Sequence, residues 1–208
     1  MSSENLEAKL EALEKRVQMQ EDIQAILRVQ YAYGYYVKRW QADEIVKLFS
    51  NDPETTVIIG DSGKVKGKEA IVKYYNHFNN PPAEFMHMTM TVTPIITVDD
   101  NGGHAKARLY SFGLLGTPGT PEKGRGALWS TGEFENEYIK EDGVWKFFKV
   151  HYNRIFMTPY SEGWAKVTDY KGGARANEPK PQDPDIVYAP YPSTYIFPYH
   201  YKNPVAGD

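Results

Sequence analysis

A predicted β-hairpin in residues 129–153 constrains the fold more than any other feature of the chain. The segment reads WSTGEFENEYIKEDGVWKFFKVHYN, and two strand-like runs flank Glu141-Asp142-Gly143. An Asp-Gly pair between such runs is a strong signal for a tight hairpin turn. In the first run, glutamates alternate with aromatic residues. The second run, residues 145–152, carries bulky side chains on both faces, so we expect it deep in a sheet with cover on each side.

The composition is that of a globular protein with one sizeable core. The chain has 208 residues, of which 41% are hydrophobic and 25% charged, with a net charge of -3, so a single domain suffices. No basic block suggests nucleic acid or an anionic membrane as a partner. There is no cysteine, which excludes disulfides and thiolate chemistry. No apolar run is long enough to span a membrane and the start does not resemble a signal peptide, so we expect a cytoplasmic protein.

Helical patterns dominate the first part of the chain. Leu6, Leu10, Leu13 and Val17 recur at spacings of four, three and four residues, which predicts an amphipathic helix with a narrow apolar stripe. We assign residues 1–20 to a helical extension that packs on its own domain or on a second subunit. A second helical segment follows Glu21-Asp22, and shorter ones are expected at residues 43–49 and 68–79.

Strand patterns follow. Residues 55–59, 85–98 and 105–115 read as strands, and the glycine-rich residues 116–126 read as a surface loop. In the long run at 85–98, His87 lies on a face made otherwise of threonine, opposite a methionine face that we expect in the core. Helices followed by antiparallel strands indicate an α+β fold.

The tail, residues 159–208, differs from the rest of the chain. It holds 8 of the 14 proline residues and many aromatic ones. Proline at that density excludes long helices and central strands, whereas the aromatic content argues against free disorder. We expect an ordered, irregular strap across the domain or a neighbouring subunit, after a main domain of residues 21–158.

Three segments together resemble a known family. YGYYVKRWQADEIVKLF, FMHMTMTV and GEFENEYIKEDGVWKFFKVHY are similar to the SnoaL-like branch of the NTF2-like superfamily, whose members include scytalone dehydratase, bile-acid dehydratase and polyketide cyclases. The resemblance covers roughly residues 20–160. It implies a cone in which N-terminal helices pack on a curved, mostly antiparallel sheet around a pocket. The same cone carries lyases, isomerases, cyclases and binding domains, so the fold alone does not fix the function.

The resemblance nominates three catalytic residues. In the family's dehydratases, a strand histidine at the position of His87 is the general base that removes a proton beside a carbonyl, work suited to a side chain whose ordinary pKa is about 6.5. The alternative is a histidine that only hydrogen-bonds in a polar cavity. A tyrosine at the position of Tyr33 donates to the substrate carbonyl. Where the family has an acid, this chain has Lys38, which either polarises a carbonyl, forms a Schiff base, or is a solvated lysine at a helix end.

Further residues are candidates for binding the substrate. Arg108 and Tyr110 share a strand face that either lines the pocket or, for Arg108, forms an outer-face salt bridge with Glu133, Glu135 or Glu137. Tyr36 and Trp129 are core residues or pocket walls, and His151 and Asn153 lie near the expected mouth of the cone. By contrast, His77, His104 and His200 read as surface residues.

The sequence therefore predicts a cofactor-free lyase or isomerase, of dehydratase, isomerase or cyclase type, acting on a hydrophobic, ring-bearing ketone. The scattered histidines predict no metal site, and no phosphate-binding glycine motif or nucleophile elbow is present. The alternatives are a non-catalytic module that binds small molecules and a structural partner subunit. We expect a small hydrophobic molecule in the pocket and a homodimer or homotrimer.

Overall fold

The computed structural model describes residues 3–60, 63–77, 81, 83–119, 126–167 and 186–206. Parts of three predicted segments, residues 78–80, 120–125 and 168–185, lie outside the described residues. The elements, in chain order, are α1 (Ser3–Val37), α2 (Ala42–Lys47), β1 (Thr56–Ile59), β2 (Lys64–Lys66), α3 (Lys68–Asn76), β3 (Met86–Val98), β4 (His104–Thr117), β5 (Gly126–Glu141) and β6 (Val144–Pro159).

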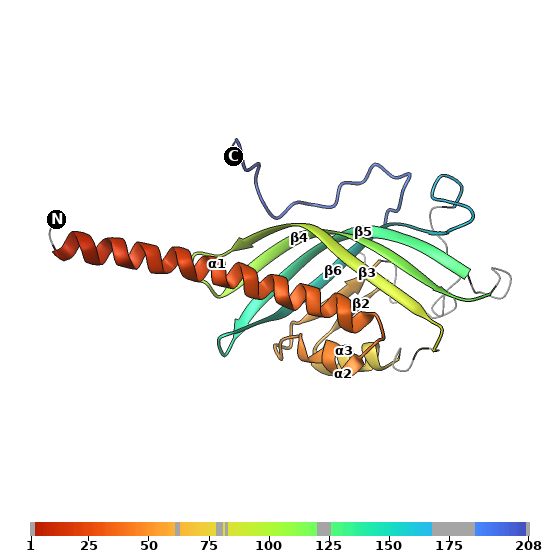
Figure 1. The fold of residues 1–208 in the computed structure, drawn as a ribbon, viewed down its shortest axis with the longest axis horizontal. Helices are drawn as coiled ribbons and strands as arrows, with labels where there is room; N and C mark the ends of the chain where they lie inside the picture. Colours follow the sequence, from red (N-terminus) through yellow and green to blue (C-terminus); the bar gives the residue numbers. More distant parts are fainter. Residues whose placement is uncertain are drawn as a thin grey trace.

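The strands form one open, six-stranded sheet in the order β2-β1-β6-β5-β4-β3. All neighbouring strands are antiparallel except β1 and β6, which are parallel. The helices cover one face, and the C-terminal segment crosses the other (Figure 1). This arrangement confirms the predicted α+β cone. None of the described helices combines the length and apolar character that crossing a membrane requires.

The core fills the space between the helices and the inward face of the sheet. It is built from aromatic and aliphatic side chains of the three helices and of β1, β4, β5 and β6. Its members include Ile26, Tyr33, Val37, Phe49, Ile71, Tyr75, Leu109, Phe134, Tyr138, Phe147 and Val150.

The predicted hairpin is confirmed. Glu141 pairs with Val144 at its end, so the loop consists of Asp142 and Gly143 alone. Both have positive φ, 51° and 79°, which is the conformation of a type I′ turn. The turn therefore sets the register of β5 and β6, the two strands at the centre of the sheet.

The expected cover on each side of β6 is present, because the core lies on one side and Phe197 of the C-terminal segment packs on His151 on the other. The assignment of bulky residues to both faces of β6 is wrong. Glu137 pairs with Lys149, whereas the next residue, Tyr138, pairs with Phe147. Phe148 is therefore the extra residue of a β-bulge, which reverses the alternation of side chains along β6. Its buried apolar residues consequently share the core face on both sides of the bulge, namely Trp145, Phe147, Val150 and Tyr152.

The two predicted N-terminal helices are one continuous helix, α1. No glycine or proline interrupts the chain near Glu21-Asp22, so only the buried face changes there and the helix does not break. All of residues 3–21 are exposed, and the first buried residue is Asp22. Its carboxylate accepts a hydrogen bond from Trp145 Nε1 at 2.8 Å and pairs with Lys140 Nζ at 2.7 Å. Burial by itself raises the pKa of Asp22, but these two donors bring it below its ordinary 3.8.

The methionine face of β3 is exposed rather than buried in the core. Met86, Met88 and Met90 are 37–45% exposed, because they point away from the helices while His87 and the threonines point toward them. β3 is an edge strand with a register shift between Val92 and Ile95. A bulge of this kind bends the strand and disrupts its edge, which disfavours pairing with another chain.

Candidate functional site

His87 lies near the start of β3 on the inward face, enclosed by aromatic rings. The imidazole is 5.2 Å from the Trp40 ring and 6.0 Å from the Phe85 ring, measured between centroids. Trp40 occupies the turn after α1 with a φ of 49°. The neighbouring Arg39 donates to the carbonyls of Ala83 and Phe85, at 3.4 and 3.1 Å. This contact holds the end of α1 against the entrance of β3, so that Trp40 stays over the histidine.

Burial controls the ionisation of His87. Its Nδ1 is inaccessible to solvent and has no hydrogen-bond partner among the described residues. Desolvation lowers the pKa of His87 to about 4, and no charged group contributes to the shift. A nearby carboxylate would raise the pKa instead. The imidazole is therefore neutral at physiological pH, with a buried ring nitrogen that accepts or donates no hydrogen bond among the described residues.

A close crossing of α1 over β3 fixes the position of this histidine. A Cβ added to Gly34 would lie 3.1 Å from the carbonyl oxygen of Thr89, which is tighter than ordinary van der Waals contact. Thr89 shares the inward face of β3 with His87, two residues away. Glycine at position 34 thus lets the helix backbone approach the strand that carries the candidate base.

Tyr33 belongs to the core beside that crossing. Its hydroxyl is 3.0 Å from the hydroxyl of Tyr75, and its ring packs edge-on against Phe147 at 5.5 Å. Tyr36 is half-buried against the same core. Lys38 lies just beyond the end of α1 and is exposed, which favours the reading of a solvated lysine over a desolvated Schiff-base lysine.

Sequence reasoning did not find a second polar group inside the fold. The Gln30 side-chain oxygen accepts hydrogen bonds from Asn136 Nδ2 and Tyr138 Oη, each at 2.8 Å. All three side chains are buried, and burial raises the pKa of Tyr138. Gln30 Nε2 is buried without a partner among the described residues. The spacing of α1 indicates only that Gln30 points inward, and its partners are more than a hundred residues away in sequence.

Arg108 lies on the opposite, outward face of the sheet. Its guanidinium contacts Glu135 at 2.9 Å and Glu133 at 3.1 Å, which is the outer-face salt bridge that the sequence left open. It also donates to the carbonyls of Phe197 and Pro198, each at 3.1 Å. Arg108 is nevertheless buried, because residues 186–206 lie over it.

Those C-terminal residues cover other outward-facing groups as well. The Tyr199 ring lies 4.3 Å from the Arg108 guanidinium. His200 Nδ1 contacts the Glu135 carboxylate, and only 4% of its side chain is exposed, so its assignment as a surface residue is wrong. The backbone N–H of Tyr191 donates to the carbonyl of Ile155 at 2.7 Å, which joins this segment directly to β6.

The remaining predicted residues also lie on the outward face. Trp129 stacks on Tyr160 with 5.6 Å between ring centroids. His151 packs against Phe197 at 4.6 Å, and burial followed by the nearby Lys149 lowers its pKa to about 4. Tyr110 is exposed and pairs with Val92, and Asn153 is buried opposite Glu133.

The nine predicted residues thus fall on two sides of the sheet. His87, Tyr33 and Tyr36 lie on the helix side, Lys38 lies exposed at the end of α1, and the other five lie on the outward side. Trp40, Phe85 and Tyr75 join the inward group. Across the part of the chain that the structure describes, no three His, Asp or Glu side chains are grouped as metal ligands would be.

The fold and the inward histidine define a small α+β protein of the helix-on-sheet cone class. The family model for the SnoaL-like domain matches residues 18–151. This match spans more than half of the chain, which therefore belongs to the SnoaL-like family. No curated protein matches the chain in sequence.

Solved structures support the same fold. A candidate scytalone dehydratase from Novosphingobium aromaticivorans is 18% identical with a TM-score of 0.59, over 76% of this chain and 99% of that one. A hexachlorocyclohexane dehydrochlorinase from Novosphingobium barchaimii is 16% identical with a TM-score of 0.59, over 70% and 94%. An NTF2-like superfamily protein from Salmonella enterica is 21% identical with a TM-score of 0.55, over 70% and 99%. At these identities the likeness establishes the fold and not the reaction.

Proposed function

We propose that the protein is a cofactor-free lyase or isomerase that removes a proton α to the carbonyl of a hydrophobic, ring-bearing ketone. The observation that carries this proposal is His87, a neutral histidine with an unpaired, buried Nδ1 between two aromatic rings. An elimination is also the kind of reaction named in two of the similar structures, a dehydratase and a dehydrochlorinase.

The proposed chemistry follows from the ionisation state of His87. The imidazole takes the α-proton, and the electron pair of the broken C–H bond moves onto the carbonyl oxygen as an enolate. In a dehydratase, the imidazolium then returns the proton to a departing β-hydroxyl, which leaves as water. In an isomerase, it returns the proton to a different carbon.

Two groups are proposed to assist. The Tyr33–Tyr75 hydroxyl pair supplies a hydrogen bond to the enolate oxygen, since a hydrogen bond received from one tyrosine makes the other a better donor. Trp40 and Phe85 provide apolar ring surface for the substrate and keep water from the imidazole. Lys38 is exposed just beyond the end of α1, so it contributes at most a long-range positive charge.

The low pKa of His87 limits the rate of proton abstraction and predicts an unusual pH profile for the reaction. A base whose pKa is about 4 is weaker than a free imidazole, and no carboxylate among the described groups raises it. Because kcat/KM reports the ionisation of the free enzyme, its pH profile follows the lowered pKa of His87. The reaction should therefore show an acid limb well below the ordinary histidine range.

A panel experiment tests the proposal. The protein is incubated in D2O with cyclic ketones, β-hydroxy ketones and steroid-like enones, and α-proton exchange is followed by NMR. We expect wild type and the surface control His104→Ala to catalyse exchange and His87→Ala to lose it by a factor of roughly a hundred or more. Equal exchange by wild type and His87→Ala would refute the assignment.

The second candidate is a non-catalytic binding module of the same fold. It is favoured by exposed Lys38 in place of the family's acid and by the lack of a charged partner for His87 among the described residues. Ligands that raise the melting temperature without any exchange would support it. A structural subunit, the third reading, would be indicated by obligatory association with a different chain. The exposed stripe of α1 and the methionine face of β3 favour a homodimer or homotrimer in each case.

A further inference from the structure

The first half of α1 projects beyond the sheet as a bare helix (Figure 1). Its apolar residues remain in solvent, with Leu6, Leu10, Leu13 and Val17 between 49% and 64% exposed. The residues that bury α1 in the domain are different ones, namely Asp22, Ile26, Gln30, Tyr33 and Val37. At 3.6 residues per turn, the mean directions of the two sets differ by about 170°. The apolar stripe therefore points away from the protein's own sheet and cannot be covered by it.

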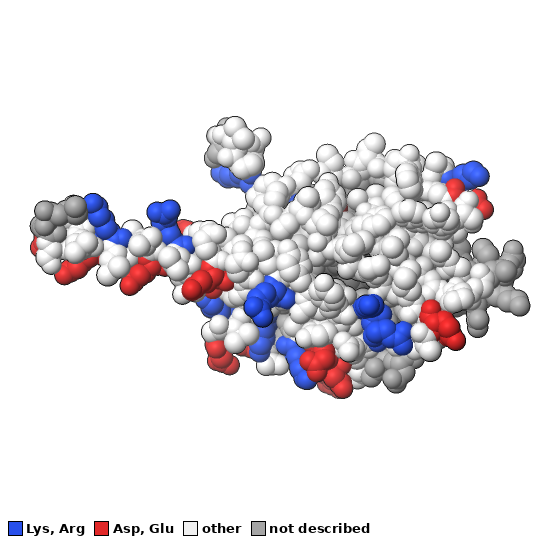
Figure 2. Space-filling view, in the orientation of Figure 1, with Lys and Arg blue, Asp and Glu red and all other residues white. Residues whose placement is uncertain are grey.

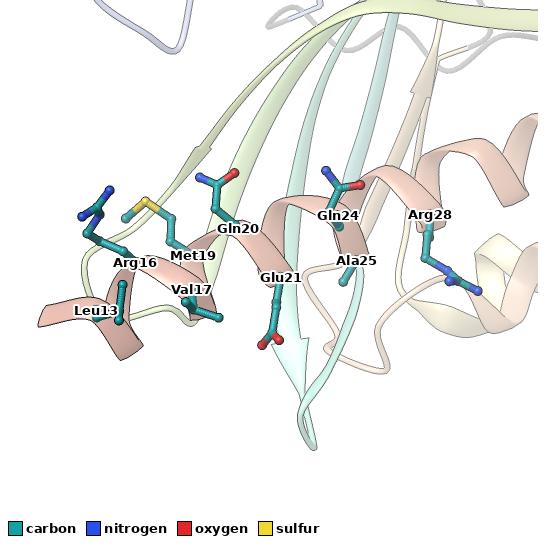
Figure 3. A pocket seen from close by; sticks show the side chains of 9 residues that line it. All are labelled: Leu13, Arg16, Val17, Met19, Gln20, Glu21, Gln24, Ala25 and Arg28. Carbon is teal, nitrogen blue, oxygen red and sulfur yellow. The ribbon is translucent and has the colours of Figure 1, made fainter. Parts of the chain in front are cut away.

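The stripe has the spacing of a coiled-coil seam. With Leu6 and Leu13 at d positions, Leu10 and Val17 fall at a positions of the heptad repeat. Gln20 and Gln24 take the next d and a positions, so the apolar contact ends at Val17. The seam residues Leu13, Val17, Gln20 and Gln24 are among the residues that line a shallow pocket on α1, and its lining among the described residues comes from this helix alone (Figure 3).

The charges that flank the stripe discriminate between possible partners. Acidic and basic side chains alternate along the projecting helix (Figure 2). The e positions beside the seam hold Glu7, Glu14 and Glu21, and the first two g positions hold Lys9 and Arg16. In a parallel pair of helices, each g residue faces the e residue of the following heptad on the partner. Lys9 then faces Glu14 and Arg16 faces Glu21, so every facing pair is attractive.

The antiparallel arrangement is disfavoured by the same residues. There, g positions face g positions and e positions face e positions, which would oppose Lys9 to Arg16 and glutamate to glutamate. Like charges at these positions are repulsive. An exposed ion pair contributes little by itself, so the apolar residues supply the association and the charges select the partner's direction.

We propose that residues 6–17 of α1 dock on the same residues of a second copy of this chain, as a parallel, in-register, two-stranded coiled coil. Valine at an a position together with leucine at d positions favours two strands. Because the seam points away from the sheet, the two domains lie at the same end of the pair and on opposite sides of it. The rest of α1 is anchored in the domain by Asp22, which preorganises the projecting part.

Disulfide trapping tests the direction of the helices. The chain has no cysteine, so one introduced thiol is unique. In the proposed pair, residue 6 lies beside residue 6 of the second copy, whereas an antiparallel pair separates them by about 17 Å. Full-length Leu6→Cys should form a disulfide-linked dimer under mild oxidation, and Ala8→Cys, at the outward f position, should not. Equal crosslinking of both variants, or none by Leu6→Cys, would overturn the proposal.

Charge variants test the contact in the full chain by light scattering. Wild type at tens of micromolar should show twice the 23.8 kDa of one chain. Lys9→Glu with Arg16→Glu should weaken association by on the order of tenfold to a hundredfold, and adding Glu14→Lys with Glu21→Lys should restore it. The control exchanges Glu11 and Lys15, whose ion pair lies within one helix, and should change nothing. A monomeric wild type, a threefold mass, or an unaffected Lys9→Glu/Arg16→Glu variant would contradict the proposal.

Discussion

Replacing Arg108 with methionine should detach the C-terminal segment and destabilise the whole protein. The guanidinium joins two carboxylates on β5 to two backbone carbonyls of the C-terminal segment. Methionine keeps much of the apolar stem but supplies no donor. Glu133 and Glu135 would then lose the guanidinium that lies between them, and the carbonyls of Phe197 and Pro198 would lose their donor.

The expected loss is large because the arginine is only 7% exposed. Removing one partner of a buried ion pair costs about 3–5 kcal/mol. For a chain of 150–250 residues, each kcal/mol lowers the melting temperature by about 2–4 °C. Arg108→Met should therefore melt roughly 6–20 °C below wild type. Adding Glu135→Gln should recover part of the loss, since it removes one of the two stranded charges.

Differential scanning calorimetry measures the melting temperature, and hydrogen exchange of residues 186–206 reports on the detachment. Lys106→Met provides the matched control, because residue 106 lies on the same strand but is exposed. The reasoning is refuted if Arg108→Met melts within 2 °C of wild type or leaves exchange in the C-terminal segment unchanged.

Three further predictions concern the inward side of the sheet. The pKa of His87 falls from 6.5 to about 4 on folding, so its contribution to stability is complete above pH 6.5 and is lost as the pH falls to about 4. The melting temperature of His87→Gln should therefore drop less than that of wild type over this range. Equal drops in the two proteins would contradict the shift. Gly34→Val should lower the free energy of unfolding by about 1–3 kcal/mol, because the valine side chain would press on the Thr89 carbonyl. A denaturant titration with the same midpoint as wild type would argue against the close crossing of α1 and β3. Asp22→Asn should cost about 1–3 kcal/mol at pH 7. The loss should shrink as the pH falls through the lowered pKa of Asp22, because the carboxylate then becomes protonated in wild type too. A loss of the same size in acid-protonated wild type would exclude the ion pair as its cause.

Local rules predict the frame of the fold well. The Asp142-Gly143 turn fixes β5 and β6, and the alternation along β3 and β4 places each side chain on the correct one of two faces. Which face is the inner one depends on contacts between distant residues. The methionines of β3 were expected inside because they are apolar, but α1 packs on the histidine and threonine side, where Gly34 allows its approach.

The candidate site shows a similar division. His87 stands out in the sequence as a lone histidine on a threonine face, and the family resemblance supplies its proposed role. Phe85, two residues before it in the predicted strand, follows from the spacing of a strand. Its other neighbour, Trp40, could not be found in this way, because the turn after α1 brings it to the histidine. The position of Arg108 was ambiguous because strand alternation does not show whether its face points into the pocket or outward. The reason for its burial lies in the C-terminal segment, some ninety residues away in sequence.

The pH dependence of α-proton exchange tests the central claim most directly. The exchange rate of one responsive cyclic ketone in D2O would be measured from about pH 3 to pH 8, in wild type and in His87→Gln. The account predicts that the wild-type rate rises with a midpoint near the lowered pKa of about 4, stays level through neutrality, and is lost in the variant. A midpoint near 6.5, or a variant with the same profile as wild type, would show that the buried His87 imidazole is not the base.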